Sequence, residues 1–128
     1  MRLLLDTHAF LWWVAGDARM TRKARAAIGA ADSDVYVSAA SAWEITTKFR
    51  IGKLPGASAI VDDLVGVVAS QSFLALPITL GHAQAAGLLA GDHRDPFDRM
   101  LIAQANAEQM MLVSSERIFE SYGVRRLW

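Results

Sequence analysis

The stretch LLLDTH, residues 3–8, decides the fold, because three consecutive leucines end at an acid. A run that is apolar at every position leaves no side for water, so it predicts a strand in a sheet that is covered on both faces. Asp6 then stands at the carboxyl end of that strand. Ligands of parallel sheets bind just outside these ends, which makes Asp6 the first candidate for a functional residue.

Four more apolar runs of strand length follow: VYV at 35–37, FLAL at 73–76, MMLV at 110–113 and the weaker VRRL at 124–127. Helical patterns lie between the runs, at residues 7–14, 21–31, 39–50, 59–70, 80–90, 96–108 and 116–121. Strands that alternate with helices need crossover connections, and crossovers make the strands parallel. The sequence therefore predicts an α/β fold, in which helices flank a parallel sheet of roughly four to five strands.

Several of these helices begin after residues that are typical N-caps, namely Thr21, Ser38, Ser58 and Thr79. Gly123 is expected to end the last helix. The tryptophans at positions 12, 13 and 43 are expected to pack into the core.

Composition limits the classes of function. The 128 residues carry no repeat or long linker, so one domain over residues 1–128 is expected. Lysine plus arginine and aspartate plus glutamate both number 13, so no basic excess drives non-specific binding to nucleic acid. Without cysteine, metal binding must rely on oxygen or histidine. The N-terminus lacks the pattern of a signal peptide or membrane span, and we expect a soluble cytoplasmic protein.

Acidic residues follow three of the strand-like runs, and two more open a helix. The set comprises Asp6, Glu44, Asp95, Asp98 and Glu116. The carboxyl ends of parallel strands share one rim, so we expect these side chains to converge. Carboxylates a few ångströms apart repel by about 4 kcal/mol per pair at an effective dielectric near 20, and such a cluster needs a cation. Ligation by oxygen alone favours Mg²⁺ or Mn²⁺.

Each acid also has a local explanation, which stays open at this point. Asp6 and Asp95 suit N-caps, the latter because Pro96 stands at the first helical position. Asp98, at the third helical position, is expected to reach back to the N–H of that cap.

Two ion pairs between residues four positions apart are expected as well. Glu44 has Lys48 as its partner on a helix, and Asp95 has Arg99. For Arg99 this pair is preferred over its alternative role as a contact to a substrate phosphate.

Four motifs occur in a characteristic order over nearly the whole chain: DTH at 6–8, SAWEI at 41–45, DPFDRML at 95–101 and LVSSE at 112–116. Together they resemble those of PIN-domain ribonucleases, and more narrowly those of the VapC toxins of type II toxin–antitoxin systems. The resemblance implies a flavodoxin-like parallel sheet and metal-dependent endonucleolytic cleavage of RNA. It places the catalytic, metal-binding acids at Asp6, Glu44 and Asp98, with Asp95 in the same cluster and Mg²⁺ or Mn²⁺ as the cofactor.

The resemblance also assigns two supporting residues. Ser114 corresponds to the hydroxyl that the family, usually with threonine, places at a strand end. Glu116 stands where the family commonly has aspartate, so the acid that would serve a second metal ion is longer here by one methylene.

Partners are implied in the same way. The resemblance implies a cognate antitoxin whose C-terminal segment blocks the acids, and dimers of the toxin. The helix expected at 59–70 has broad apolar coverage and is expected to line the groove for that segment.

Two rival functions remain open. A metal-dependent phosphatase on a related α/β fold also uses an aspartate after its first strand, but DTH lacks the second acid two residues on. A PIN-like module that has lost activity and works only by binding a partner is the other rival, and Glu116 is its best support.

Overall fold

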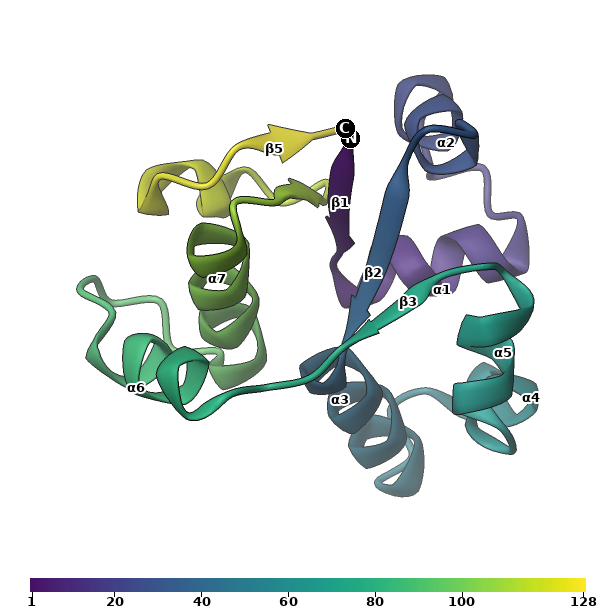
Figure 1. The fold of residues 1–128 in the computed structure, drawn as a ribbon. Coiled ribbons are helices and arrows are strands. Elements are labelled where there is room, and N and C mark those ends of the chain that lie inside the picture. Colours follow the sequence, from purple (N-terminus) through teal and green to yellow (C-terminus); the bar gives the residue numbers. More distant parts are fainter.

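A computed structural model describes all residues from Met1 to Trp128 and shows a parallel sheet between layers of helices (Figure 1). Its strands are β1 (Arg2–Leu5), β2 (Asp34–Ser38), β3 (Leu74–Leu76), β4 (Met111–Val113) and β5 (Arg126–Leu127). They lie in the order β3-β2-β1-β4-β5, and every neighbouring pair is parallel. The predicted α/β fold is therefore confirmed.

The three leucines of β1 form the centre of the core, and none of them is exposed to solvent. Leu3 and Leu5 pack with apolar side chains on one face of the sheet, whereas Leu4 packs on the other face. Because Leu3, Leu4 and Leu5 are covered on both faces and β1 is paired on both edges, these three positions are all apolar, and the next polar residue is Asp6.

Helices cover the two faces unequally (Figure 1). One face carries α1 (Thr7–Ala15), α2 (Arg22–Gly29), α4 (Ser58–Val61) and α5 (Leu64–Ser70), and the other carries α6 (Leu80–Leu88) and α7 (Pro96–Glu108). α3 (Ala39–Arg50) contacts both α1 and α7 and lies at the carboxyl end of β2. Two short 3₁₀ helices, η1 (Pro55–Ala57) and η2 (Arg117–Tyr122), complete the list. No helix is of a length and apolarity that would cross a membrane.

Side chains cap the helices much as the sequence predicts. Asp6, Thr21, Ser38, Thr79 and Asp95 each accept a hydrogen bond from a backbone N–H in the first turn of the helix that follows. Gly123 ends η2 in the left-handed conformation, with φ of 76°. The capping residues thus fix where the chain leaves each strand.

Four local predictions were wrong. The helix expected at 59–70 is broken into α4 and α5, because Asp63 leaves the helical conformation to cap α5 by accepting from the N–H of Gly66. Ser58 is the first residue of α4 and makes no capping bond. The last helix is 3₁₀ and not α. Trp43 is 63% exposed and lies outside the core.

The strand order changes direction between β1 and β4. The chain runs from β1 outward to β2 and β3, then crosses back to β4 on the other side of β1. This reversal in strand order leaves a crevice at the carboxyl ends of β1 and β4. Asp6 follows β1 and Ser114 follows β4, so both flank the crevice.

Candidate active site

Asp6 lies at the centre of this rim and is nearly inaccessible to solvent. Its backbone N–H donates to the carbonyl of Val113 at 3.1 Å, and its Oδ1 accepts from the N–H of Ala9 at 2.8 Å. Burial raises the pKa of the Asp6 carboxyl from 3.8 to about 6, although hydrogen bonds from the Ser114 side chain and the Ala9 N–H oppose the rise. The predicted N-cap is confirmed. An exposed aspartate could cap the helix equally well, so capping does not explain why Asp6 is buried at a cost to its ionised form.

Glu44 is held from two sides on α3. Its Oε1 accepts from the Thr7 hydroxyl at 2.5 Å, and that hydroxyl also lies 3.1 Å from the Ser41 hydroxyl. Its Oε2 forms an ion pair with Lys48 one turn later, which confirms the expected pair. The side chain of Glu44 is only 5% exposed, so the carboxylate of this pair is buried.

The helix start at Asp95 places two acids in different roles. Oδ1 of Asp95 accepts from the backbone N–H groups of Phe97 and Asp98, at 2.9 and 3.2 Å. Asp98 does not reach back to the cap. Its Oδ2 instead lies 2.8 Å from Nε2 of His93, so the expected capping box was wrong.

The four acids act on one another through their charges. Burial raises the pKa of Asp98, and the neighbouring charges of Asp95 and Glu44 raise it further, against a hydrogen bond from His93. The charge of Asp98 in turn raises the pKa of Asp6. Acids from β1, α3 and α7 therefore share one electrostatic environment, although they lie far apart in the sequence.

Lys48 supplies positive charge to this environment. Burial works against its charge, but its hydrogen bond to Glu44 and the charges of Asp95 and Asp98 outweigh that effect and raise the pKa of Lys48. One ammonium group thus interacts with three of the four acids.

The two residues that follow β4 differ. Ser114 is fully buried, and its Oγ accepts from the N–H of Glu116 at 3.0 Å while the side chain hydrogen-bonds to Asp6. Glu116 is exposed, and its carboxylate makes no hydrogen bond or ion pair. Ser114 therefore contacts the cluster, whereas no hydrogen bond or ion pair links the carboxylate of Glu116 to it.

Arg99 does not pair with Asp95, so that prediction was wrong. Its guanidinium donates to backbone carbonyls instead, to Ala86 at 3.3 Å, to His93 at 3.1 Å and to Leu89. These acceptors lie at the end of α6 and in the loop that follows. Each of the three guanidinium nitrogens thus donates once to a backbone carbonyl, and two of the five N–H groups make no hydrogen bond within the protein.

The side chains of this cluster are of the type that binds a hard divalent cation, because they are carboxylates gathered at one rim. The ammonium of Lys48 supplies a positive charge among them in this structure. No three acidic or histidine side chains converge to the spacing of a metal site in this structure. The structure therefore supports the choice of ligand type and gives no coordination geometry.

Sequence reasoning missed Thr7 and His93, which hold Glu44 and Asp98. Thr7 lies inside the quoted motif DTH, next to Asp6, and a polar residue at the start of a buried helix was a usable signal. His93 is five residues from Asp98 on the far side of a proline, and no helical spacing links the two.

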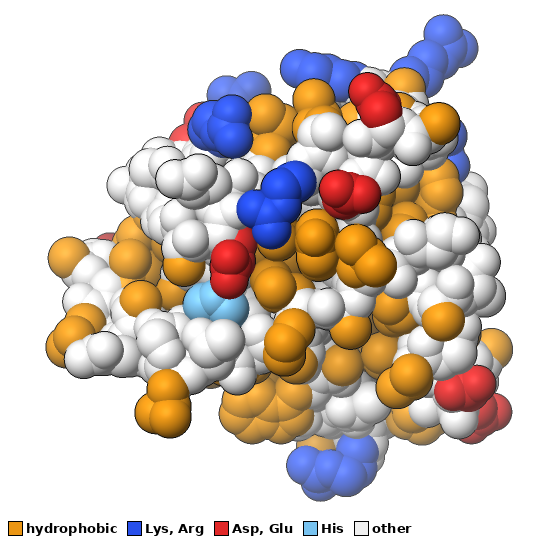
Figure 2. All heavy atoms as spheres, viewed as in Figure 1, with side chains coloured by type: hydrophobic (Ala, Val, Ile, Leu, Met, Phe, Trp, Pro, Cys, Tyr) orange, Lys and Arg blue, Asp and Glu red, His pale blue; other side chains and the backbone are white.

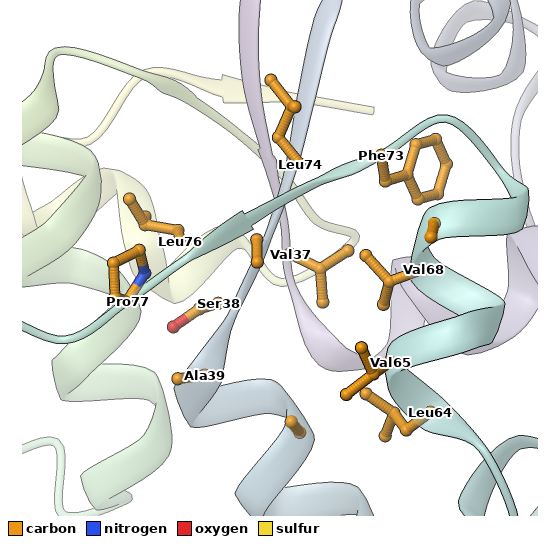
Figure 3. A pocket seen from close by; sticks show the side chains of 13 residues that line it. Val37, Ser38, Ala39, Leu64, Val65, Val68, Phe73, Leu74, Leu76 and Pro77 are labelled. Carbon is orange, nitrogen blue, oxygen red and sulfur yellow. The ribbon is translucent and has the colours of Figure 1, made fainter.

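An apolar groove lies along the free edge of the sheet. It has a volume of about 700 Å³ and runs between β3 and α5, with the start of α3 at its end. Figure 2 shows apolar side chains gathered across the middle of this face, and Figure 3 shows those of α5 opposite those of β3. Of the 13 lining residues 11 are hydrophobic, and Val65 on α5 is 80% exposed.

The acids lie at the switch point of a parallel α/β sheet, where proteins with such sheets bind their ligands. Comparison with known proteins identifies the family. The model of the PIN domain family matches residues 3–124. The chain belongs to the PIN domain family. No curated protein matches its sequence significantly.

Solved structures share the fold at low sequence identity. A chain in the crystal structure of VapBC2 from Rickettsia felis, bound to a promoter DNA fragment, has a TM-score of 0.71 and 13% identity, with full coverage of both chains. VapBC-1 from nontypeable Haemophilus influenzae gives 0.68 and 12%, covering 98% of this chain and 96% of the other. FitAcB from Neisseria gonorrhoeae gives 0.61 and 17%, covering 97% and 95%.

Proposed function

We propose that this protein is the toxin of a type II toxin–antitoxin pair, of the VapC kind, and that it is an endoribonuclease dependent on Mg²⁺ or Mn²⁺. The observation that carries the proposal is the electrostatic coupling of Asp6, Glu44 and Asp98 at the switch point of a PIN-family sheet. The structural relatives come from toxin–antitoxin complexes, which supports the same assignment. The proposed compartment is the cytoplasm, where the RNA substrate is found.

Asp6, Glu44 and Asp98, with Asp95 beside them, would hold the cation. A bound divalent ion supplies Lewis acidity toward the scissile phosphate and an activated water for in-line attack. The residues around the acids keep them in place. Thr7 orients Glu44, Ser114 donates to Asp6, and the Lys48 ammonium stands close enough to offset negative charge when a phosphate enters.

The nuclease assignment is tested with a labelled RNA, in the presence of Mn²⁺ or of a chelator. We expect cleavage that needs the metal and that Asp98→Asn abolishes. Asp62→Asn is the matched control, because Asp62 is an exposed aspartate in the break between α4 and α5. Cleavage that persists in the chelator, or that survives in Asp98→Asn, would contradict the proposal.

The same preparation separates the two rival functions. A phosphatase would hydrolyse p-nitrophenyl phosphate and leave RNA intact. An inactive module would cut neither substrate and gain no stability from metal. For the nuclease, Mn²⁺ at about 100 times its Kd should add roughly 2.7 kcal/mol to the free energy of unfolding, and Asp6→Asn should remove most of that gain.

We further propose that the apolar groove between β3 and α5 receives a segment of the antitoxin. β3 is an edge strand paired only with β2, so its outer backbone groups are free to pair with an extended peptide. The hydrophobic lining suits alternate apolar side chains of that peptide. Ser38 and Ala39, at the end of the groove, connect β2 to the helix that carries Glu44, so a longer segment reaches the acids.

A homodimer would use another surface. Leu80 and Leu88, at the two ends of α6, are 87% and 78% exposed, which is unusual for large apolar side chains and favours contact with a second copy.

Two variants test these surfaces separately. Val65→Glu should abolish antitoxin binding and leave the dimer intact, whereas Leu80→Glu should dissociate the dimer and leave antitoxin binding intact. Sedimentation velocity with and without antitoxin measures both effects.

A further inference from the structure

We propose that His93 is a positioning residue for Asp98, and that its imidazole holds the Asp98 carboxylate in the orientation that binds a divalent cation. The inference rests on the proposed function and adds to it a residue that none of the motifs marks. Its evidence is a set of contacts that fix the loop between α6 and α7.

The contact between the two side chains is direct. Nε2 of His93 lies 2.8 Å from Oδ2 of Asp98, and an ionised carboxylate can only accept, so the imidazole donates. The other carboxylate oxygen, Oδ1, makes no hydrogen bond within the protein. One oxygen is thus engaged and the other is left for a ligand. Each side chain is about a quarter exposed, at 25% and 26%, so the pair borders the solvent.

The backbone of His93 is fixed by the other end of the chain. Its N–H donates to the Tyr122 hydroxyl at 3.0 Å, and the two rings lie with their centroids 6.4 Å apart. Gly91 allows this approach. It has φ of 107°, and a Cβ at that position would lie 2.6 Å from the Tyr122 hydroxyl oxygen. A side chain at position 91 would therefore push Tyr122 away from His93.

Arg99 fixes the same loop from inside. Its guanidinium binds the carbonyl of His93 at 3.1 Å, together with two carbonyls at the end of α6. His93 is thus held at its N–H by Tyr122 and at its C=O by Arg99. These two backbone contacts restrict the position of the His93 Cα, and the bond to Asp98 then sets the direction of the imidazole.

This arrangement has a known physical use. Carboxylates that bind metal ions are commonly oriented by a second hydrogen-bonding partner, and loss of that partner typically lowers metal affinity about 10- to 100-fold. A purely structural histidine would affect folding and leave the affinity of the folded protein for metal unchanged. Metal affinity therefore distinguishes the two roles.

The experiment measures Mn²⁺ binding to the full-length protein by isothermal titration calorimetry, with folding checked by circular dichroism. We expect His93→Ala to weaken Mn²⁺ binding about 10- to 100-fold. His93→Gln, which keeps an N–H donor, should recover part of that loss. Tyr122→Phe, which removes the hydroxyl that holds His93, should weaken binding in the same direction. Tyr36→Phe removes the same group from β2 and is the matched control, with unchanged affinity expected.

Two failures are distinguishable. If the parent binds Mn²⁺ and both His93→Ala and Tyr122→Phe bind it equally well, the role of His93 is overturned while the proposed function stands. If the parent itself does not bind Mn²⁺, the proposed function and this role fall together. Should His93→Ala not fold, Tyr122→Phe decides alone, because it retains the ring that packs against Gly91.

Discussion

The ammonium group of Lys48 pairs with the buried carboxylate of Glu44 one turn earlier on α3. The same ammonium acts electrostatically on Asp95 and Asp98, so a single cation serves acids from two helices. Residues four apart on a helix are often in contact, but here the carboxylate is buried in the candidate site while the lysine is partly exposed to solvent.

Removal of this cation should destabilise the fold. Lys48→Met leaves Glu44 buried without its partner. Because Lys48 is about one-third exposed, we expect a loss between that of a surface pair and that of a buried pair, about 1 to 2 kcal/mol at pH 7. Urea denaturation with a chelator present measures the change. Lys48→Arg keeps the charge and is the control; an equal loss in both variants would assign the effect to packing.

Stability should fall as pH rises through the titration of Asp6. The pKa of this carboxyl is raised in the folded protein, from 3.8 to about 6, so the folded state binds more protons than the unfolded state between these values. Its stabilising contribution is complete below pH 4 and is lost by about pH 6, a difference of about 3 kcal/mol. Chemical denaturation from pH 4 to 7, without divalent ions, measures it.

Asp6→Asn is the control for this titration. It keeps an oxygen that can accept from Ala9 and has no charge to bury, so its stability should vary less over the same interval. A parent protein whose stability rises between pH 4 and 6 in parallel with the variant would show that Asp6 ionises easily, contrary to its burial.

The Thr7 hydroxyl should matter to catalysis through Glu44. Thr7→Val has nearly the same shape and removes the donor to Oε1 of Glu44. We expect RNA cleavage and Mn²⁺ affinity to fall about 10-fold, as is typical when a residue that orients a ligand is lost. Thr7→Ser retains the hydroxyl and should stay close to the parent. Equal loss in both variants would assign the effect to the packing of the Thr7 side chain and not to its hydroxyl.

A buried polar network behind the site should contribute to stability alone. Gln104 is fully buried on α7, accepts from the Ser38 hydroxyl at 2.5 Å and donates to the carbonyl of Pro77 at 3.3 Å. Gln104→Leu removes the acceptor of the buried Ser38 hydroxyl, which then keeps only its bond from the Ala40 N–H, and should cost about 1 to 3 kcal/mol in thermal or urea unfolding. Gln84→Ala, on the exposed surface of α6, adds no large apolar side chain between Leu80 and Leu88; it is the control and should have little effect.

The fold was predictable because its signals are local. LLL before Asp6 predicts a strand buried on both faces, and alternation with helices predicts the parallel sheet. The strand order was not predictable, because nothing in a short apolar run says which neighbour it pairs with. The break at Asp63 was missed because its side chain competes with the helix for the N–H of Gly66, while the apolar pattern continues on both sides.

The candidate site was predictable in composition and only partly in geometry. Spacing correctly paired Glu44 with Lys48, since both lie on one helix. It wrongly paired Asp95 with Arg99 at the same spacing, because carbonyls at the end of α6 compete for the guanidinium. A contact between a loop and a helix, such as that of His93 with Asp98, depends on tertiary structure, and no regular spacing in the sequence indicates it.

The hydrogen bond from the N–H of Asp6 to the carbonyl of Val113 joins the beginning of the chain to a strand near its end. During synthesis on a ribosome, Asp6 and Glu44 emerge early, but α7 and β4 must follow before Asp98 and Ser114 can join them. The acids can therefore assemble only after α7 and β4 have left the ribosome, so the complete cluster forms late in the synthesis of this domain.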